Sequence, residues 1–239
     1  MAAFEQTAVN SLPDGYRALV IGASGTIGAE FAAMLAADRR CSAVVGLHRH
    51  SQPAIDMQDE ASIAAAGKVL ADSAPFHLII HAAGFLHDGD LMPEKKLSDL
   101  RSDNLMKSFT VNAIGPALVL RYFSPLLSRE GGRMIFLSAK VGSIGDNRLG
   151  GWYGYRASKA ALNMLVKTAS IELKRTTPKA IVIAMHPGTV NSKLSKPFGG
   201  ETKGRAAGVA CREMLNTIDG LEPEQTGQFL SYSAEQLPW

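Results

Sequence analysis

Cysteine is scarce in this sequence, and its scarcity argues against two classes of protein. Cys41 and Cys211 are the only cysteines among 239 residues, and they lie far apart. Small secreted domains held together by disulfides need more cysteines, and structural zinc sites need closely spaced ligands. We therefore interpret both residues as reduced thiols of a cytoplasmic protein, and we expect no metal site.

Runs of like charge and long apolar stretches are also missing. The formal net charge is +3, and nowhere do five or six like charges stand together. Neither a nucleic acid nor a membrane surface is therefore an expected partner. No uncharged apolar stretch is long enough to cross a bilayer. Residues 1–14 lack a basic segment followed by an apolar one, so they do not fit a signal peptide. These absences again favour a cytoplasmic location.

The sequence does contain a regular alternation of short apolar runs and longer segments with helical spacing. Apolar residues make up 46% and charged residues 20% of the chain, as in an ordinary globular domain. Uninterrupted apolar runs indicate strands that are buried on both faces. The expected strands are Ala18–Ile21, Ala43–Leu47, His77–His81, Arg133–Leu137, Ala180–Met185 and Gln228–Ser231. The expected helices are Gly28–Ala37, Ala61–Ala71, Ser102–Leu127, Tyr155–Lys174 and Arg205–Ile218.

This alternation predicts the fold class. We expect residues 1–239 to form a single doubly wound α/β domain of the Rossmann type, with helices on both faces of a mostly parallel sheet of about seven strands. Ligands of such folds bind beyond the carboxyl ends of the strands. The residues that follow each strand are therefore the first candidates for function.

A glycine-rich turn follows the first expected strand. The segment Gly22–Gly28 (GASGTIG) comes directly after Ala18–Ile21 and opens a helical segment. Glycines allow a tight turn and let backbone N–H groups approach a pyrophosphate, and the helix N-terminus adds partial positive charge. We interpret this turn as a phosphate-binding loop; a purely structural turn is the alternative.

The residues after the second expected strand indicate which dinucleotide is bound. That strand ends at Leu47 and is followed by His48, Arg49 and His50. NAD-preferring sites carry an acidic residue near this position. No acid stands here, and the guanidinium of Arg49 matches a 2′-phosphate in charge and in geometry. We therefore expect NADP(H), with NAD(H) the less favoured cofactor. If Arg49 is only a solvated surface residue, the choice stays open.

Tyr155 and Lys159 are the expected catalytic pair. They are four residues apart in a segment of good helix formers, which puts both side chains on one helical face. An ammonium group near a phenol lowers the pKa of the phenol from about 10. Tyr155 can then donate a proton to a carbonyl oxygen, or remove one in the reverse direction.

Five motifs, in the same order, resemble the classical short-chain dehydrogenases/reductases over nearly the whole chain. They are Gly22–Gly28 (GASGTIG), Ala82–Gly84 (AAG), Val111–Ala113 (VNA), the pair Tyr155 and Lys159, and His186–Gly188 (HPG). Within this family, the segment Gly150–Asn163 is most similar to the sniffer-like and C-factor-like carbonyl reductases.

The resemblance implies a role for each matching residue. Tyr155 would be the general acid/base, Lys159 would lower its pKa and bind the nicotinamide ribose, and Asn112 would hold a water of the proton relay. For Asn112, a helix residue that bonds nearby backbone is the alternative. The other implied cofactor contacts are Gly22, Ser24, Gly25, Thr26 and Ile27 at the phosphates, Asp56 and Met57 at the adenine, Ala83 and Gly84 at the ribose, and Pro187, Gly188 and Val190 at the carboxamide.

Two departures from the family pattern concern the cofactor side. The family usually has glycine where Thr26 stands, and Gly25 lies one place early, so the turn must differ slightly. The family's Asn-Asn pair after the fourth strand is His81 and Ala82 here, which implies one lost hydrogen bond between strands. His81 is a candidate to replace that bond, and we expect a buried structural histidine rather than a catalytic one.

A third departure concerns the catalytic serine. The family places it three residues before a glycine, and counting back from Gly142 gives Ala139. Ser138 precedes that position, and Ser143 follows the glycine. Because neighbouring strand residues point to opposite faces, Ser138 can serve only if the strand end bends. We favour Ser138; Ser143, or no serine at all, are the alternatives.

The substrate side is less specific. The segment Thr189–Gly200 is rich in glycine, serine and lysine, and it predicts a lid over the substrate. Leu194, Pro197 and Phe198 are expected to cover an apolar carbonyl compound. Trp152 is either a wall of the pocket or a residue that packs its loop onto the core.

The expected function is NADP(H)-dependent interconversion of a small-molecule aldehyde or ketone and its alcohol. A weakly active or inactive NADP-binding signalling or regulatory protein is the alternative, and Ala139 and Thr26 support it. The resemblance also implies a homodimer or homotetramer built from the two longest helices, so an interaction module is a further alternative. The residues do not identify the substrate.

Overall fold

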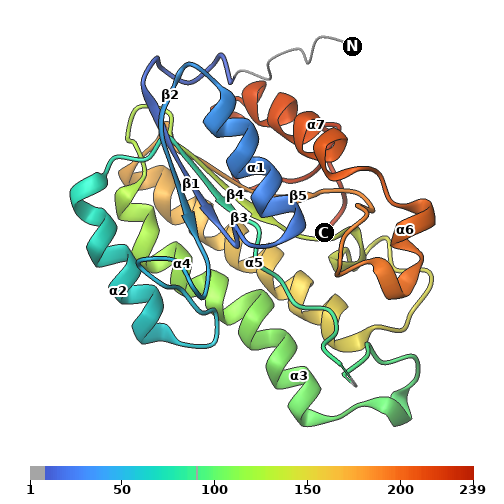
Figure 1. The fold of residues 1–239 in the computed structure, drawn as a ribbon. Helices are drawn as coiled ribbons and strands as arrows, with labels where there is room; N and C mark the ends of the chain where they lie inside the picture. Colours follow the sequence, from blue (N-terminus) through green and yellow to red (C-terminus); the bar gives the residue numbers. More distant parts are fainter. Residues whose placement is uncertain (1–8, 90) are drawn as a thin grey trace.

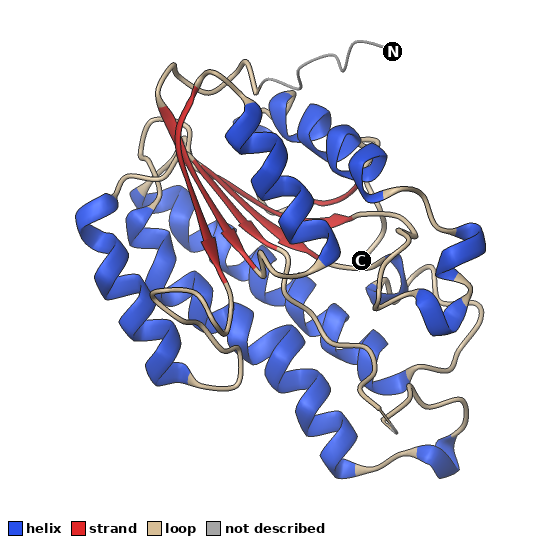
Figure 2. Cartoon of the chain, in the orientation of Figure 1, coloured by secondary structure: helices blue, strands red, loops and turns tan. Residues whose placement is uncertain are grey.

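Six parallel strands form the centre of the molecule (Figures 1 and 2). The computed structural model describes residues 9–89 and 91–239. The expected fold class, a doubly wound α/β domain, is confirmed, with six strands rather than about seven among the described residues. In the order β2-β1-β3-β4-β5-β6 every neighbouring pair is parallel. The strands are β1 (Tyr16–Ile21), β2 (Cys41–Leu47), β3 (Leu78–His81), β4 (Arg133–Leu137), β5 (Ile181–His186) and β6 (Phe229–Ser231).

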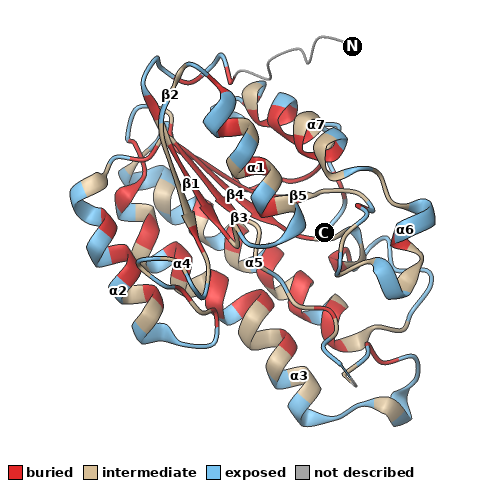
Figure 3. Cartoon of the chain, in the orientation of Figure 1, coloured by how far each residue is buried: buried red, intermediate tan, exposed pale blue. Residues whose placement is uncertain are grey.

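Alternate side chains of the strands enter two separate hydrophobic cores. In β1, Leu19 and Ile21 belong to one core, whereas Ala18 and Val20 belong to the other. All four are fully buried, and Figure 3 shows the central strands as buried. Fully burying a Val, Leu or Ile side chain contributes roughly 1.5–3 kcal/mol. An apolar run without polar alternation is therefore stable only where helices cover both faces.

The helices divide between the two faces of the sheet. The first core contains residues of α2, α4 and α5, and the second contains residues of α1 and α7. The third helix, α3, packs on α5, and the short α6 follows the segment after β5 (Figure 1). Their bounds are α1 (Thr26–Ala37), α2 (Glu60–Leu70), α3 (Ser102–Phe109), α4 (Gly115–Phe123), α5 (Tyr153–Thr176), α6 (Gly200–Lys203) and α7 (Ala207–Asp219).

The expected helix Ser102–Leu127 is not regular throughout. After α3 the chain forms a π-type turn over Thr110–Ile114, continues as α4 and ends in a 3₁₀ turn over Ser124–Leu126. A π-type turn inserts an extra residue into the helix and is frequent at functional sites. Asn112 lies in this turn and is fully buried. Apolar periodicity indicates the buried face of a helix, but it does not register such a local widening.

The direction of chain connection reverses between β1 and β3. From β1 the chain crosses to β2 on one side, and from β3 it crosses to β4 on the other. In open α/β sheets this switch point is where ligands bind, beyond the carboxyl ends of the strands. Gly22 directly follows β1 and Ala82 directly follows β3, so the glycine-rich turn lies at that position.

Three sequence expectations concern membranes, metals and thiols. Within residues 9–89 and 91–239, no helix is both long enough and apolar enough to cross a membrane. The same residues contain no group of three or more His, Cys, Asp or Glu that could hold a metal ion. Cys41 is a partly buried free thiol and Cys211 a buried one.

Candidate active site

Three adjoining cavities form one groove along the carboxyl edge of the sheet. We call them the inner, middle and outer cavity, in order from Arg49 to Trp152, and their volumes are about 430, 380 and 530 Å³. The inner and middle cavities share Ser24, Gly25 and residues 82–84. The middle and outer cavities share walls that include Ser138 and Tyr155.

The glycine-rich turn forms the wall between the inner and middle cavities. Gly22 has a φ of +87°, and a Cβ there would lie 2.6 Å from the backbone nitrogen of Ala83. A Cβ on Gly28 would collide with the carbonyl oxygen of Gly22. Both positions therefore require glycine, the first for its backbone conformation and the second because α1 begins directly against the turn.

The N-terminus of α1 opens onto the middle cavity. Gly25 is the N-cap and has no side chain to cap the helix. Ser24, Thr26 and Ile27 line the same cavity. The first N–H groups of a helix have no partner within the helix and carry partial positive charge. With Gly25 as N-cap, the departure at Thr26 leaves a cradle suited to an anion such as phosphate.

The inner cavity carries more positive than negative charge. Arg49 is exposed and lines this cavity. Asp88 is the one acidic residue among its lining residues, and the carboxylate of Asp88 pairs with Lys107 Nζ at 2.7 Å. Lys107 most of all, and Arg49 to a smaller extent, hold the pKa of Asp88 below its usual value. A phosphate group therefore meets no unpaired acid here.

Of the two residues expected at the adenine, only one lines the inner cavity. Met57 does so, but Asp56 does not. The Asp56 carboxylate instead accepts a hydrogen bond from Gln58 N–H at 2.9 Å, which stabilises the turn that carries Met57 and Gln58. Gln58 also lines the cavity. Only its place beside Met57 could have pointed to Gln58 in the sequence.

Asn112 holds the backbone that follows β3. Its carboxamide nitrogen donates to Phe85 O at 2.8 Å, and its oxygen accepts from Phe85 N–H at 2.8 Å. The same nitrogen donates to Ser158 Oγ at 3.1 Å, which links this backbone to α5. These bonds use both N–H groups of the side chain. The partners are distant in the sequence, so these bonds differ from the local backbone bonds of the alternative interpretation. A water in a proton relay stays a prediction.

Tyr155 and Lys159 lie together on α5, as expected, but burial dominates their pKa values. Tyr155 is 9% and Lys159 3% exposed. Lys159 Nζ donates to Leu137 O at 2.9 Å and lies 5.9 Å from the centre of the Tyr155 ring. Burial raises the pKa of Tyr155 to about 12 and lowers that of Lys159 to about 8. Burial of the phenol therefore opposes the expected lowering of the tyrosine pKa.

Among the serine alternatives, only Ser138 lines the groove. It comes directly after β4, where the strand ends and a 3₁₀ turn begins shortly afterwards, and it borders both the middle and the outer cavity. Its hydroxyl donates to Asn163 Oδ1 at 2.6 Å. Ser143 lines neither cavity; its hydroxyl accepts from Asp146 N–H and contacts Trp239 O. Ala139 lines the outer cavity beside Ser138.

The residues after β5 form the floor between the middle and outer cavities. Pro187 lines both of these cavities, and Gly188 and Val190 line the outer one. Arg205 supports them, because its guanidinium donates to Pro187 O at 2.7 Å and lies 3.6 Å from the centre of the Tyr232 ring. Nothing in the sequence singled out Arg205, since its contacts join segments that no motif connects.

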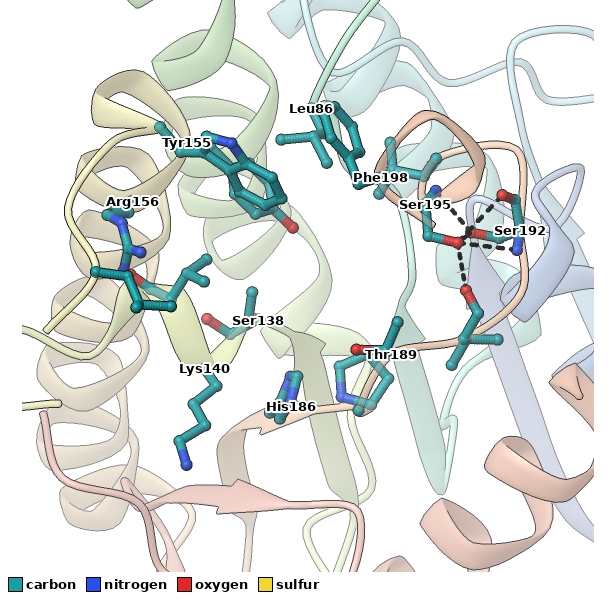
Figure 4. A pocket seen from close by; sticks show the side chains of 18 of the residues that line it. Leu86, Ser138, Lys140, Tyr155, Arg156, His186, Thr189, Ser192, Ser195 and Phe198 are labelled. Atoms are coloured by element: carbon teal, nitrogen blue, oxygen red, sulfur yellow. Dashed lines mark hydrogen bonds between the residues drawn. The ribbon is translucent and has the colours of Figure 1, made fainter. Parts of the chain in front are cut away.

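Aromatic side chains enclose the outer cavity. The Trp152 ring lies 4.8 Å from the Phe198 ring and 6.2 Å from the Tyr155 ring, both edge to face. Figure 4 shows Tyr155 and Phe198 on opposite sides of the same space. Leu194 and Phe198 line this cavity as expected, whereas Pro197 does not. Trp152 also lines it, which favours a wall of the pocket over packing onto the core.

His81 is a buried residue of the sheet. Its ring stacks on Phe136 with 5.4 Å between the ring centres, and its Nε2 lies 3.3 Å from Met57 Sδ. Burial, with a smaller effect of Lys159, lowers the pKa of His81 to about 3, so the ring is neutral. These contacts agree with a structural histidine.

The groove combines a cradle suited to phosphate at the switch point with a proton donor beyond the neighbouring strands. Among Rossmann-type proteins, this combination indicates a nucleotide-dependent oxidoreductase. Comparison with family models makes the class specific. Residues 16–202 match the short chain dehydrogenase family. The match covers more than half of the chain, so this protein belongs to that oxidoreductase family, and the resemblance of its motifs is confirmed.

Two relatives share a large part of this sequence. C-signal of Myxococcus xanthus is 38% identical over 146 residues, which cover 60% of this chain and 83% of C-signal. The 1-hydroxy-2-glutathionyl-2-methyl-3-butene dehydrogenase of Rhodococcus sp. (strain AD45) is 30% identical over 189 residues, which cover 79% of this chain and 80% of the dehydrogenase.

Solved structures share the fold over nearly the whole chain. NADPH-bound carbonyl reductase from chicken fatty liver has a TM-score of 0.82 and 22% identity, covering 95% of this chain and 96% of its own. The carbonyl reductase Sniffer of D. melanogaster has a TM-score of 0.81 and 19% identity, covering 94% and 99%. At this identity the likeness establishes the fold.

Proposed function

We propose that this chain is an NADP(H)-dependent oxidoreductase that interconverts an aldehyde or ketone and an alcohol. The observation that carries the proposal is the place of Tyr155, which lines both the middle and the outer cavity. A dinucleotide lying along the inner and middle cavities would end beside Tyr155. A substrate in the outer cavity would meet the same hydroxyl group.

The walls of the inner and middle cavities fit a phosphorylated dinucleotide. The glycine cradle at Gly22 and the N-terminus of α1 suit its pyrophosphate. Arg49 suits a 2′-phosphate, because Lys107 already pairs with the acid that lines the inner cavity. The chicken carbonyl reductase that shares this fold is solved with NADPH bound. NAD(H) is the less favoured cofactor. When bound, the nicotinamide supplies or accepts a hydride.

Tyr155 supplies the proton in the proposed reaction. Because burial raises the pKa of Tyr155 to about 12, the phenol is protonated at neutral pH and can donate to a carbonyl oxygen. Lys159 would bind the nicotinamide ribose while it keeps its bond to Leu137 O. Ser138 would polarise the carbonyl once its hydroxyl turns from Asn163 towards the outer cavity.

Binding and turnover test this proposal in sequence. Purified protein is titrated with NADPH and with NADH, followed by fluorescence, and is then assayed on a panel of aldehydes and ketones. We expect tighter binding of NADPH, and a loss of turnover of about 10²- to 10⁴-fold in Tyr155→Phe. Tyr153→Phe, on the same helix but outside the three cavities, is the matched control. Failure to bind either dinucleotide, or full turnover in Tyr155→Phe, would overturn the proposal.

A signalling or regulatory protein that binds NADP and turns over little is the second candidate. Ala139 stands at the usual serine position, and the hydroxyl of Ser138 is bonded to Asn163. A relative with 38% identity bears the name C-signal. Tight NADPH binding without turnover on any carbonyl would favour this candidate. Turnover that disappears in Tyr155→Phe would favour the enzyme.

The partner surface is a further part of the proposal. Met106 and Ile114 are exposed on the path from α3 to α4, and Met164 and Ile171 are exposed on α5. We propose that these helices join two copies of the chain as a homodimer, or as half of a homotetramer. Light scattering coupled to gel filtration should give a mass above that of one chain, and Met164→Lys should shift it downwards. A monomeric parent protein would contradict this.

A further inference from the structure

The entry into α5 has an unusual backbone conformation. Trp152 is the N-cap of α5 with φ of 54° and ψ of 43°, which is left-handed and uncommon for an aromatic residue, and its own side chain makes no capping bond. Its ring forms a wall of the outer cavity, and Tyr155 follows in the first turn of the helix. Whatever holds this entry therefore sets the positions of both side chains.

Glu94 accepts two hydrogen bonds from this entry, from outside the helix. It lies between β3 and α3 and is only 4% exposed. Its backbone carbonyl accepts a hydrogen bond from Trp152 N–H at 2.5 Å, and its Oε2 accepts from Gly154 N–H at 3.0 Å. A buried carboxylate is tolerated only where it is paired, and the amides and positive end of a helix N-terminus provide that pairing.

The residue type at position 154 fits this arrangement. A Cβ on Gly154 would lie 3.1 Å from Glu94 Oε1 and 3.2 Å from Ser108 Oγ, which is tighter than ordinary contact. Glycine there leaves room for the carboxylate to approach the helix. Glu94 lines none of the three cavities, so it touches neither the proposed cofactor site nor the proposed substrate site.

We infer that Glu94 is a positioning residue, which fixes the first turn of α5 and thereby places the Tyr155 hydroxyl and the Trp152 ring at the outer cavity. Its catalytic consequence rests on the function proposed above. Its structural consequence does not, because the position of Trp152 can be measured without turnover.

Glu94→Ala tests the catalytic consequence. We expect kcat to fall roughly 10- to 100-fold, since small displacements of a reacting group cost about that much, while the Kd for NADPH changes less than about twofold. Glu94→Gln should recover most of kcat, because the amide oxygen still accepts the Gly154 bond. Asp99→Ala is the matched control: its carboxylate accepts from Lys95 and Lys96 N–H in the same segment, and kcat should stay near the parent value.

Fluorescence quenching tests the structural consequence. Trp152 and Trp239 are the only tryptophans, so Trp239→Phe isolates the emission of Trp152. In that background Glu94→Ala should increase quenching of Trp152 by acrylamide, and Glu94→Gln and Asp99→Ala should not. If Glu94→Ala does not fold, Glu94→Asp, which keeps the charge and withdraws the carboxylate by one methylene, is expected to show the same two effects.

The outcomes separate the two proposals. If the parent protein reduces no carbonyl, the proposed function fails, and Trp152 quenching still decides whether Glu94 holds the entry into α5. Unchanged kcat and unchanged quenching in Glu94→Ala and Glu94→Asp would overturn the role of Glu94. Equal losses in Asp99→Ala would also overturn it, because they would reflect general loosening of the segment.

Discussion

The proposed cofactor side and the proposed substrate side of the groove are built in different ways. On the proposed cofactor side, two tight turns, 22–27 after β1 and 82–84 after β3, line both cavities. The substrate side consists of side chains such as Leu86, Trp152 and Phe198, which come from three distant segments. A backbone cradle is specified by a few closely spaced glycines, whereas a side-chain pocket changes with the side chains that line it. The motifs of the first side therefore identify the family, whereas the residues of the second side do not identify the substrate.

Gly22→Ala should break the cofactor side with the largest effect. A left-handed conformation costs a non-glycine residue about 1–2 kcal/mol, and overpacking against Ala83 adds about 1–3 kcal/mol. The free energy of unfolding, measured by urea denaturation, should fall by roughly the sum of the two, and NADPH titration should show no binding. Gly15→Ala is the control, since Gly15 has φ of +78° and nothing within 4 Å of a Cβ. It should lose only the conformational part, and equal losses in both variants would contradict the clash.

Lys159→Met tests the burial of a charge at the boundary between the two sides, through the pH dependence of stability. The pKa of Lys159 falls from 10.5 to about 8 on folding, because of burial. Below pH 8 the lysine is charged in both the folded and the unfolded state, so burial of the charge destabilises the fold fully. Between pH 8 and 10.5 only the unfolded state keeps the proton, and the free energy of unfolding therefore rises with pH. Lys159→Met should therefore raise the free energy of unfolding at pH 7 by about 1–3 kcal/mol.

The gain from Lys159→Met should shrink towards zero as pH approaches 10.5. Urea denaturation without cofactor at pH 7 and at pH 10 measures this difference. Lys174→Met, at the exposed end of α5, is the control and should show no such trend. A gain of the same size at both pH values would mean that Lys159 is not buried as a charge.

Arg49→Ala sharpens the comparison within the cofactor side. Loss of a hydrogen bond to a charged group costs about 1.5–3 kcal/mol, so the affinity for NADPH should fall roughly 10- to 100-fold, and the affinity for NADH much less. Titration of both dinucleotides measures the ratio. His50→Ala, an exposed neighbour that does not line the inner cavity, is the control. Equal losses for NADPH and NADH would show that Arg49 does not bind the 2′-phosphate.

Phe198→Ala should have the smallest effect, and it should affect only the substrate side. An edge-to-face aromatic contact contributes about 0.5–1.5 kcal/mol, so the KM for an apolar carbonyl compound should rise roughly 2- to 10-fold, with NADPH affinity unchanged. Steady-state kinetics gives both quantities. Pro197→Ala, in the same 3₁₀ turn but outside the cavity, is the control. A lower affinity for NADPH in Phe198→Ala would mean that the two sides are not separable.

Particular residues show where sequence reasoning succeeded and where it ended. All six expected strands occur, because an uninterrupted apolar run is stable where both of its faces are covered, as they are in this sheet. The prediction of one helix from Ser102 missed the π-type turn at Asn112, because apolar periodicity does not show which backbone N–H each carbonyl accepts from. Glu94 and Arg205 were missed because each acts on a segment distant in the sequence.

The sequence by itself determined the fold class, the family and the glycine-rich turn, because each depends on neighbouring residues: apolar runs, closely spaced glycines, and a tyrosine and lysine one helical turn apart. Only the tertiary structure decided that Ser138 rather than Ser143 reaches the groove, that Asp56 does not line it, and that burial raises the pKa of Tyr155. These outcomes depend on burial and on contacts between distant segments, and such contacts exist only once the chain has folded.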